Sequence, residues 1–146
     1  MTGLILSELH QRHVVEGRPL TAKLEAALRA RENAAARFSG FRVGAAIEDI
    51  QGRIHTGCNI ENASYGLTIC AERVALFKAI SEGAKEFARM AVVADTTDLT
   101  PPCGACRQML WEFCRDVEVI LANLQGKTER FSMSELYPRP FDASYL

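Results

Sequence analysis

Residues 70–94 read CAERVALFKAISEGAKEFARMAVVA and contain two patterns in direct succession. The first predicts a helix that begins at about Cys70 and ends near Gly83, because glycine commonly follows the last turn of a helix. We expect its inward-facing side chains to be those of Val74, Phe77 and Ile80. The second pattern, over residues 90–94, is wholly apolar, which is typical of a central strand buried on both faces. A helix that leads directly into a buried strand indicates helices packed on a sheet.

The segments on either side of this stretch extend the same pattern. Helices are predicted over residues 21–37 and 103–114, and strands over residues 41–47, 53–58, 117–122 and 128–133. The resulting order, α-β-β-α-β-α-β-β, predicts an α/β fold in which helices pack on a mixed sheet. Residues 1–20 are less patterned and are interpreted as an N-terminal extension, with a short helix over residues 4–13. A single domain is expected over residues 21–146.

The composition excludes several classes of protein. The chain has 146 residues with 17 basic and 18 acidic side chains, and therefore a formal net charge of −1. Apolar residues make up 48% of the chain, which is enough for a packed core and excludes a disordered protein. The longest uninterrupted apolar run, residues 90–94, is far shorter than the roughly 20 residues of a membrane span. The balanced charge and the absence of signal-peptide features predict a cytoplasmic protein with neither nucleic acid nor membrane as partner.

The chain has five cysteines, an odd number. In a reducing compartment they are expected to be thiols, metal ligands or nucleophiles rather than disulfides. Cys103 and Cys106 are spaced C-x-x-C, on one face of the first turn of their predicted helix. In a sheet with strand–helix–strand crossovers, the N-terminal ends of successive helices lie at the same edge. The sequence therefore places Cys70 beside Cys103 and Cys106.

Three convergent thiolates are ligands that suit Zn²⁺, and a set of three leaves the fourth coordination position open, as in catalytic zinc sites. Glu72 follows Cys70 by two residues, so on a regular helix the two side chains point about 200° apart. Both can reach one point if the zinc lies over the end of the helix, and Glu72 can then move protons without being a ligand. A structural zinc site and a redox C-x-x-C pair are the alternatives. A structural site normally has four protein ligands, and a redox pair explains neither Cys70 nor Glu72. The residues favour a catalytic zinc and leave both alternatives open.

Five blocks of the sequence resemble the cytidine deaminase family, specifically its small homotetrameric zinc class. They are FRVGAAI (41–47), GCNIENASYG (57–66), CAERVALFKAISEG (70–83), PCGACRQML (102–110) and NLQG (123–126). The resemblance extends over residues 24–146, and C-A-E followed by P-C-x-x-C matches the Cys₃ form of the zinc deaminase signature. It implies a three-layer α/β/α sandwich with a mixed five-stranded sheet. The sequence differs from the family at residues 37–39, which read Arg-Phe-Ser rather than Pro-Tyr-Ser, and at Pro101, where serine is usual.

The resemblance also implies roles for particular residues. One zinc ion per chain would be bound by Cys70, Cys103 and Cys106, and Glu72 would transfer protons. The substrate would contact Phe41, Asn59, Glu61, Ala71 and Phe141. Among these, Asn59 and Glu61 match a pair that binds the ribose, and Phe41 matches an aromatic residue that packs against the pyrimidine. Phe141 would reach the site of a neighbouring subunit, and simple packing between subunits is its alternative role.

The residues give Arg73 a role of its own. Zn²⁺ with three thiolates carries a net charge of −1, which weakens the metal as a Lewis acid. Arg73 can donate hydrogen bonds to the ligand sulfurs and offset that charge; its alternative role is a solvated helix residue. Cys58 and Cys114 are interpreted as small buried residues, and His55 as a surface residue of a strand.

The expected function is the zinc-dependent hydrolytic deamination of cytidine and 2′-deoxycytidine to the uridines, with release of ammonia, as in pyrimidine salvage. Three alternatives remain. The substrate can be another cytosine-like nucleoside such as a nucleoside antibiotic, although the intact N-I-E-N block argues for an ordinary ribose. A nucleic-acid editing deaminase would need a basic surface, which a net charge of −1 does not favour. A non-catalytic zinc domain would have no use for Glu72.

Overall fold

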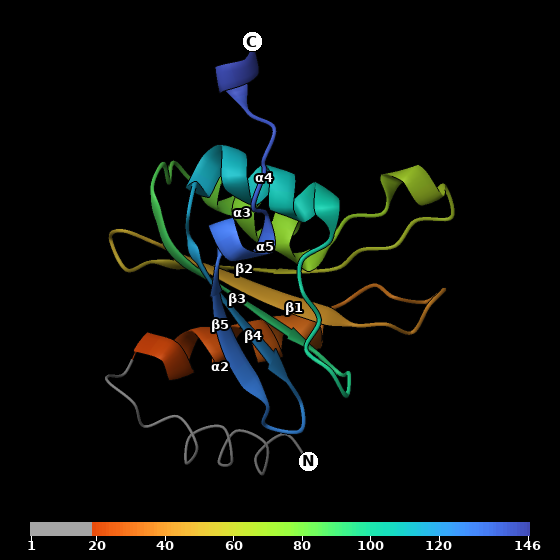
Figure 1. Ribbon diagram of the computed structural model, residues 1–146. Coiled ribbons are helices and arrows are strands. Elements are labelled where there is room, and N and C mark those ends of the chain that lie inside the picture. Colours follow the sequence, from red (N-terminus) through yellow and green to blue (C-terminus); the bar gives the residue numbers. More distant parts are fainter. Residues whose placement is uncertain (1–18) are drawn as a thin grey trace.

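The computed structural model describes residues 19–146 (Figure 1). Its helices are α2 (Pro19–Arg31), α3 (Ala71–Ser81), α4 (Gly104–Cys114) and α5 (Met133–Leu136), with 3-10 turns at Tyr65–Leu67 (η1) and Ala143–Tyr145 (η2). Its strands are β1 (Val43–Asp49), β2 (Ile54–Cys58), β3 (Phe87–Ala94), β4 (Glu118–Asn123) and β5 (Thr128–Ser132). The helix expected over residues 4–13 lies outside the described residues.

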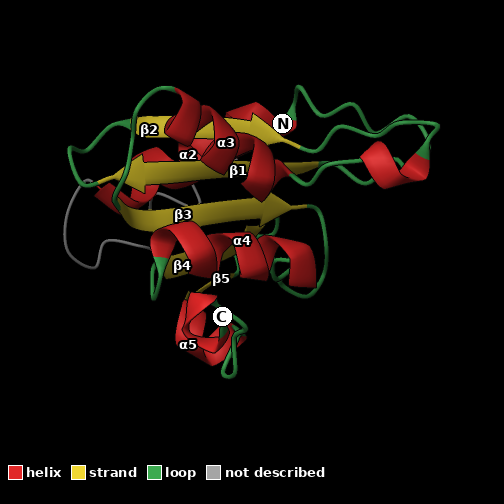
Figure 2. Cartoon of the chain, turned by 90° about the horizontal axis from the view of Figure 1, so that it is seen from above, coloured by secondary structure: helices red, strands yellow, loops and turns green. Residues whose placement is uncertain are grey.

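The strands form one mixed sheet in the order β2-β1-β3-β4-β5. Strand β1 is antiparallel to both β2 and β3, β3 is parallel to β4, and β4 is antiparallel to β5. Helices α3 and α4 cover one face of the sheet and α2 covers the other (Figures 1 and 2). The predicted fold class, a three-layer α/β/α sandwich with a five-stranded sheet, is confirmed. None of the helices in this described part is long and apolar enough to cross a membrane.

The central strand β3 separates two apolar clusters. Val92 points toward α3 and α4, whereas Ala91 and Val93 point toward α2. All five residues from Met90 to Ala94 have at most 1% of their surface exposed, as expected for a strand covered on both faces. The wholly apolar run therefore contributes to both apolar clusters of the core.

Helix α2 ends at Arg31 rather than at residue 37, so the predicted end was wrong. The three alanines that follow favour a helix by local propensity. Instead, the backbone of Ala35 accepts a hydrogen bond from Glu61 and donates one to Asn59. These tertiary hydrogen bonds replace the helical ones and bring the chain to the edge where the site described below lies.

The inward face of α3 also differs from the prediction. Phe77 is 40% exposed, and Val74 and Ile80 are only partly buried. The fully buried face consists of Ala71, Ala75, Leu76 and Ala79. The helix lies so close to the sheet that small side chains fit there better than large ones.

His55 is buried rather than on the surface of β2, with 6% of its side chain exposed. Its Nδ1 lies 2.6 Å from a carboxylate oxygen of Glu82 and its Nε2 lies 3.2 Å from Asp49. Burial opposes ionisation of Asp49, but hydrogen bonds from His55 and Arg53 lower its pKa to about 2. His55 therefore joins the β1–β2 hairpin to the C-terminal end of α3.

Gly57 marks the closest approach of α3 to the sheet. A Cβ atom at this position would lie 2.4 Å from the backbone nitrogen of Ala75 and 2.5 Å from the carbonyl oxygen of Ala71. We expect Gly57→Ala to lower the free energy of unfolding by about 1–3 kcal/mol, because the helix must move away from the strand. Denaturant unfolding measures the change.

Gly66→Ala is the matched control, because a Cβ atom at Gly66 meets nothing within 4 Å. The control is expected to leave the unfolding midpoint close to that of the unmodified chain. Equal stability of the Gly57 and Gly66 variants would contradict the close packing of α3.

Candidate functional site

The candidate site lies at the edge of the sheet where α3 and α4 begin. Strands β2, β3 and β4 run in the same direction, because β2 and β3 are both antiparallel to β1 and β3 is parallel to β4. The connections β2–α3–β3 and β3–α4–β4 therefore start both helices at the same edge. Cys70 is the residue that caps α3, and Cys103 is the residue that caps α4. Cys106 lies in the first turn of α4.

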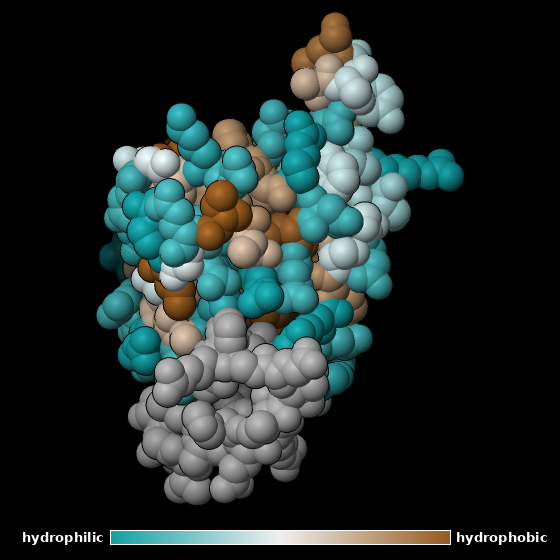
Figure 3. Space-filling view, turned by 90° about the vertical axis from the view of Figure 1, so that its left-hand side faces the viewer, coloured by the Kyte–Doolittle hydropathy of each residue, from teal (hydrophilic) through white to brown (hydrophobic). Residues whose placement is uncertain are grey.

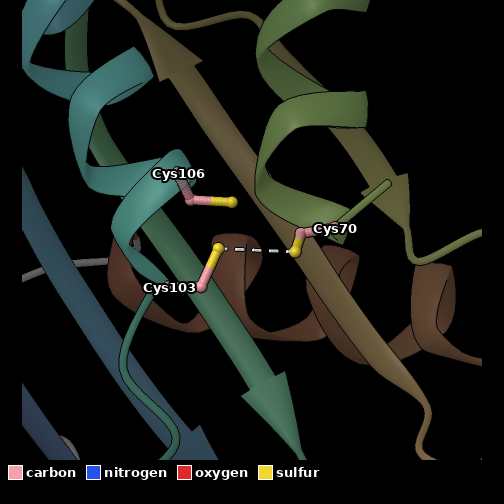
Figure 4. Close-up of side chains that lie close together, drawn as sticks. All are labelled: Cys70, Cys103 and Cys106. Carbon is pink, nitrogen blue, oxygen red and sulfur yellow. Dashed lines mark hydrogen bonds between the residues drawn. The ribbon is translucent and has the colours of Figure 1, made fainter. Parts of the chain in front are cut away.

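The side chains of Cys70, Cys103 and Cys106 point toward one another (Figure 4). The three sulfur atoms all lie within 4.8 Å of one another, and those of Cys70 and Cys103 are 3.7 Å apart. Zinc–sulfur bonds of about 2.3 Å in a tetrahedron place two sulfurs about 3.8 Å apart. The cluster therefore has the size and the donor atoms of a zinc site that has three protein ligands.

The charges around the cluster favour thiolate at Cys70. The thiol of Cys106 and the guanidinium of Arg73 donate hydrogen bonds to its sulfur and lower its pKa to about 5. The pKa of Cys106 is raised, because its thiol hydrogen-bonds the Cys70 sulfur and is buried. Nη2 of Arg73 lies 3.8 Å from the Cys70 sulfur, whereas its buried Nε has no hydrogen-bond partner among the described residues. Arg73 thus faces the sulfurs rather than solvent.

Glu72 lies beside the cluster and is buried, with 5% of its surface exposed. Burial raises the pKa of its carboxyl group to about 7. The residue lines a cavity of about 270 Å³ that also contacts Cys70 and Cys103. A carboxyl group in this position can exchange protons with a molecule that enters the cavity.

Phe41, Asn59 and Glu61 also line the cavity. Asn59 donates a hydrogen bond of 2.7 Å to the carbonyl of Phe41 and accepts one of 2.8 Å from the backbone nitrogen of Val43. Phe41 lines the cavity and remains 40% exposed, so part of the residue is accessible for contact. Asn59 therefore fixes the backbone on both sides of Phe41.

Glu61 fixes the segment before Phe41 in the same way. Its carboxylate accepts hydrogen bonds from the backbone nitrogens of Phe38 and Ser39, at 2.8 and 3.2 Å, and from the hydroxyl of Ser39. The Ser39 hydroxyl is the largest cause of the lowered pKa of Glu61. Sequence reasoning missed Ser39, although a serine two residues before a predicted substrate-contacting aromatic residue was a usable signal.

The remaining predicted contact residues lie in different places. Ala71 is fully buried and lines the cavity. Phe141 is 55% exposed in the C-terminal tail, where its ring stacks on Tyr145 with centroids 5.6 Å apart. The structure therefore does not bring Phe141 to the cavity of its own chain. Thr100 and Pro101, which sequence reasoning did not assign, form another part of the cavity wall.

Cys58 and Cys114 lie outside the three-sulfur group. Both are partly buried, and burial raises the pKa of Cys114 to about 12. Neither has the environment of a metal ligand or a nucleophile.

Comparisons with known proteins agree with this geometry. A family model described as "Cytidine and deoxycytidylate deaminase zinc-binding region" matches residues 20–122. A cytidine deaminase from Halalkalibacterium halodurans is 53% identical over 121 residues, which cover 82% of this chain and 92% of that protein. A cytidine deaminase from Sporosarcina psychrophila is 49% identical, with coverage of 80% and 89%.

A crystal structure of cytidine deaminase from Burkholderia pseudomallei superposes with a TM-score of 0.81 at 47% identity, and the match covers 84% of this chain and 98% of that one. The family model and the sulfur cluster together confirm the expected zinc cofactor.

Removing one sulfur tests the metal site. We expect Cys106→Ala to lower the zinc content from about one ion per chain to a small fraction of that, because three-thiolate binding needs every ligand. The thermal midpoint is expected to fall as well, because metal-binding free energy contributes to folding. Metal analysis of the purified protein measures the content. Cys58→Ala is the control and is expected to retain its zinc; full zinc in the Cys106 variant would show that the site is elsewhere.

Proposed function

This chain belongs to the cytidine and deoxycytidylate deaminase family, whose members are hydrolases, and we propose that it deaminates cytidine and 2′-deoxycytidine. The products are uridine or 2′-deoxyuridine and ammonia. The observation that carries the proposal is the buried carboxyl of Glu72, which lines one cavity together with two of the three clustered cysteines. A zinc site that served only the fold would not need a buried carboxyl group beside it.

Cys70, Cys103 and Cys106 would hold the zinc ion, which would supply a Lewis acid for the activation of water. Glu72 takes a proton from the attacking water while the water oxygen forms a bond to C4 of the pyrimidine ring. Glu72 then gives that proton to N3. The remaining hydroxyl proton passes through Glu72 to the amino group, the C4–N bond breaks, and ammonia leaves. One water is consumed and one ammonia is released, and Glu72 is a carboxylate again at the end of the reaction.

Arg73 assists from behind the sulfurs. Its guanidinium lies 3.8 Å from the Cys70 sulfur and draws off part of the excess thiolate charge. Arg73 thereby preserves the Lewis acidity of a zinc ion at the three-thiolate site. Replacing one thiolate with a neutral ligand would have the same effect.

The sugar lies against the wall that contains Asn59 and Glu61, and the pyrimidine packs against Phe41. Asn59 and Glu61 keep residues 38–43 in place and also line the cavity, so a ribose hydroxyl there meets preorganised amide and carboxylate groups. A carboxylate at this wall attracts hydroxyl groups and repels phosphate. The substrate class is therefore a free nucleoside rather than a nucleotide.

The protein acts as a homotetramer in the cytoplasm, in pyrimidine salvage. Exposed apolar side chains that a neighbouring subunit can cover support the assembly: Phe77 on α3, Phe113 on α4, and Tyr65 and Leu67 at η1. The C-terminal tail carries the exposed Phe141 and is tied to α4 through Phe141 and Asp142, and its last turn projects from the body of the chain and ends in apolar atoms (Figure 3). In the tetramer the ring of Phe141 reaches a neighbour's cavity.

Ammonia release from cytidine, 2′-deoxycytidine, CMP, cytosine and adenosine tests the substrate class. The two cytosine nucleosides are expected to react, with CMP and free cytosine far poorer. Glu61→Ala is expected to lose about 2 kcal/mol or more of transition-state stabilisation in kcat/KM, because a sugar hydroxyl loses its partner. Glu86→Ala, which removes an exposed carboxylate that does not line the cavity, is the control. Comparable turnover of CMP would overturn the assignment.

Glu72→Gln separates proton transfer from metal binding. Glutamine keeps the size and part of the hydrogen bonding of the side chain but cannot carry protons. The variant is expected to keep about one zinc per chain and to lose activity on cytidine by at least the ~10²–10⁴-fold typical of general acid–base catalysis. Metal analysis and kinetics on one preparation decide the matter, and light scattering on the same sample counts the subunits. Loss of zinc would make Glu72 a ligand, and near-normal activity would place the proton carrier elsewhere.

A further inference from the structure

The loop of residues 95–103 joins β3 to α4 and carries both a wall of the cavity and a metal ligand. Thr100 and Pro101 form the wall, and Cys103 ends the loop. The start of the loop is fixed by Asn123, which is 2% exposed and donates hydrogen bonds of 3.0 and 3.1 Å to the carbonyls of Thr96 and Thr97. The end of the loop needs a support of its own, because small movements there displace the Cys103 sulfur.

Proline limits how that end can be held. Pro101 and Pro102 have no backbone N–H, so the loop can be fixed there only through its carbonyl groups. Arg107, one turn into α4, donates a hydrogen bond of 2.7 Å from Nε to the carbonyl of Pro102, a buried residue. The accepting carbonyl belongs to the peptide that leads directly into Cys103.

The same guanidinium makes a second contact. Nη1 of Arg107 donates a hydrogen bond to the carbonyl of Leu136, the last residue of α5. Arg107 thus ties the metal-ligand loop to an element that is distant in the sequence. A planar guanidinium can hold two carbonyls at a fixed separation, whereas the ammonium of lysine is a single point on a flexible chain.

We propose that Arg107 is a positioning residue that fixes Cys103 and the adjoining cavity wall by holding the Pro102 carbonyl against the end of α5. The proposal rests on the zinc-dependent deamination proposed above. Arg107 touches neither the sulfurs nor the cavity in the structure, so it acts through the loop. Its loss loosens one of the three zinc ligands without removing any of them.

Helix α4 offers a matched control in Arg115. Nη1 of Arg115 lies 3.7 Å from a carboxylate oxygen of Asp142, in the C-terminal tail. The indole of Trp111 donates a hydrogen bond of 3.0 Å to the same carboxylate, and Trp111 is the single tryptophan of the chain. Arg115→Gln therefore removes an arginine that holds the tail but not the loop, and Trp111 fluorescence reports on the tail in every variant.

The first measurement is the rate of zinc release from the zinc-loaded protein to an excess of a chromogenic chelator, with no nucleoside present. Arg107→Gln is expected to release zinc about tenfold faster than the unmodified chain, the lower end of the 10–100-fold effect of losing a group that supports metal ligands. The rate of zinc release from Arg107→Lys is expected to lie between the rates of the unmodified chain and of Arg107→Gln. Arg115→Gln is expected to change Trp111 emission and to leave the rate of zinc release unchanged.

The second measurement is turnover of cytidine by freshly zinc-loaded protein. In Arg107→Gln, kcat is expected to fall about tenfold with KM near its original value, because the sugar-contacting wall is untouched. A residue that only stabilised the fold would lower the unfolding midpoint without changing kcat per zinc-loaded chain. Circular dichroism melts identify a variant that fails to fold, in which case Arg107→Lys carries the test.

Unchanged zinc release in a folded Arg107→Gln variant would overturn the proposal, as would equal acceleration in Arg115→Gln. Failure of the proposed function would give a different result. The unmodified chain would then not release ammonia from cytidine, while the rate of zinc release would still differ between Arg107→Gln and Arg115→Gln.

Discussion

The contact of α3 with β2 at Gly57 is the constraint on which the rest of the structure depends. Backbone atoms of the helix occupy the space of a side chain at this glycine, and the buried face of α3 is made of small residues and one leucine. The helix is therefore held at a fixed height and rotation over the sheet. Its first turn carries Glu72, and the residue that caps it is Cys70. Moving the helix would move the proposed proton carrier and a cysteine of the metal cluster together, so the packing of the core sets the geometry of the site.

The two walls of the cavity are built by the same physical means. On one side, Asn59 and Glu61 hold the backbone of residues 38–43 through hydrogen bonds from side chains to main-chain groups. On the other, Asn123 and Arg107 hold the two ends of the loop of residues 95–103. Both walls are irregular segments without a ladder of backbone hydrogen bonds, and polar side chains, buried or partly buried, bind their backbone groups instead. The polar residues that do so lie in the blocks N-I-E-N, P-C-G-A-C-R-Q and N-L-Q-G. Those blocks therefore combine residues that shape the site with residues that hold its shape.

The fold and the metal cluster could be predicted from the sequence because their signals are local. The wholly apolar run at residues 90–94 predicts the central strand. A cysteine at the start of each of two helices predicts the cluster, because the strand–helix–strand connections run in the same direction and start both helices at one edge of the sheet. The end of α2 could not be predicted, because Ala35 leaves the helix for hydrogen bonds to Asn59 and Glu61, which are distant in the sequence. The inward face of α3 was misjudged because apolar periodicity favours large side chains, whereas the face that lies against the sheet consists of three alanines and one leucine. His55 looked like a surface residue because its two carboxylate partners come from two other elements.

The electrostatics of the site follow from placing three sulfurs and one carboxyl group in a small volume. Three thiolates on Zn²⁺ leave a net negative charge, and an ionised Glu72 beside them adds another. The fold opposes this accumulation with the N-terminal ends of α3 and α4 and with the guanidinium of Arg73, all of which face the sulfurs. Burial of Glu72 also limits the negative charge, because it raises the pKa of the carboxyl group to about 7 and makes its neutral, protonated form accessible. The proposed role of Glu72, which is to accept a proton from water and then pass it to the pyrimidine, needs both the protonated and the ionised form. The arrangement thus keeps the metal site positive enough to activate water while Glu72 remains able to carry a proton.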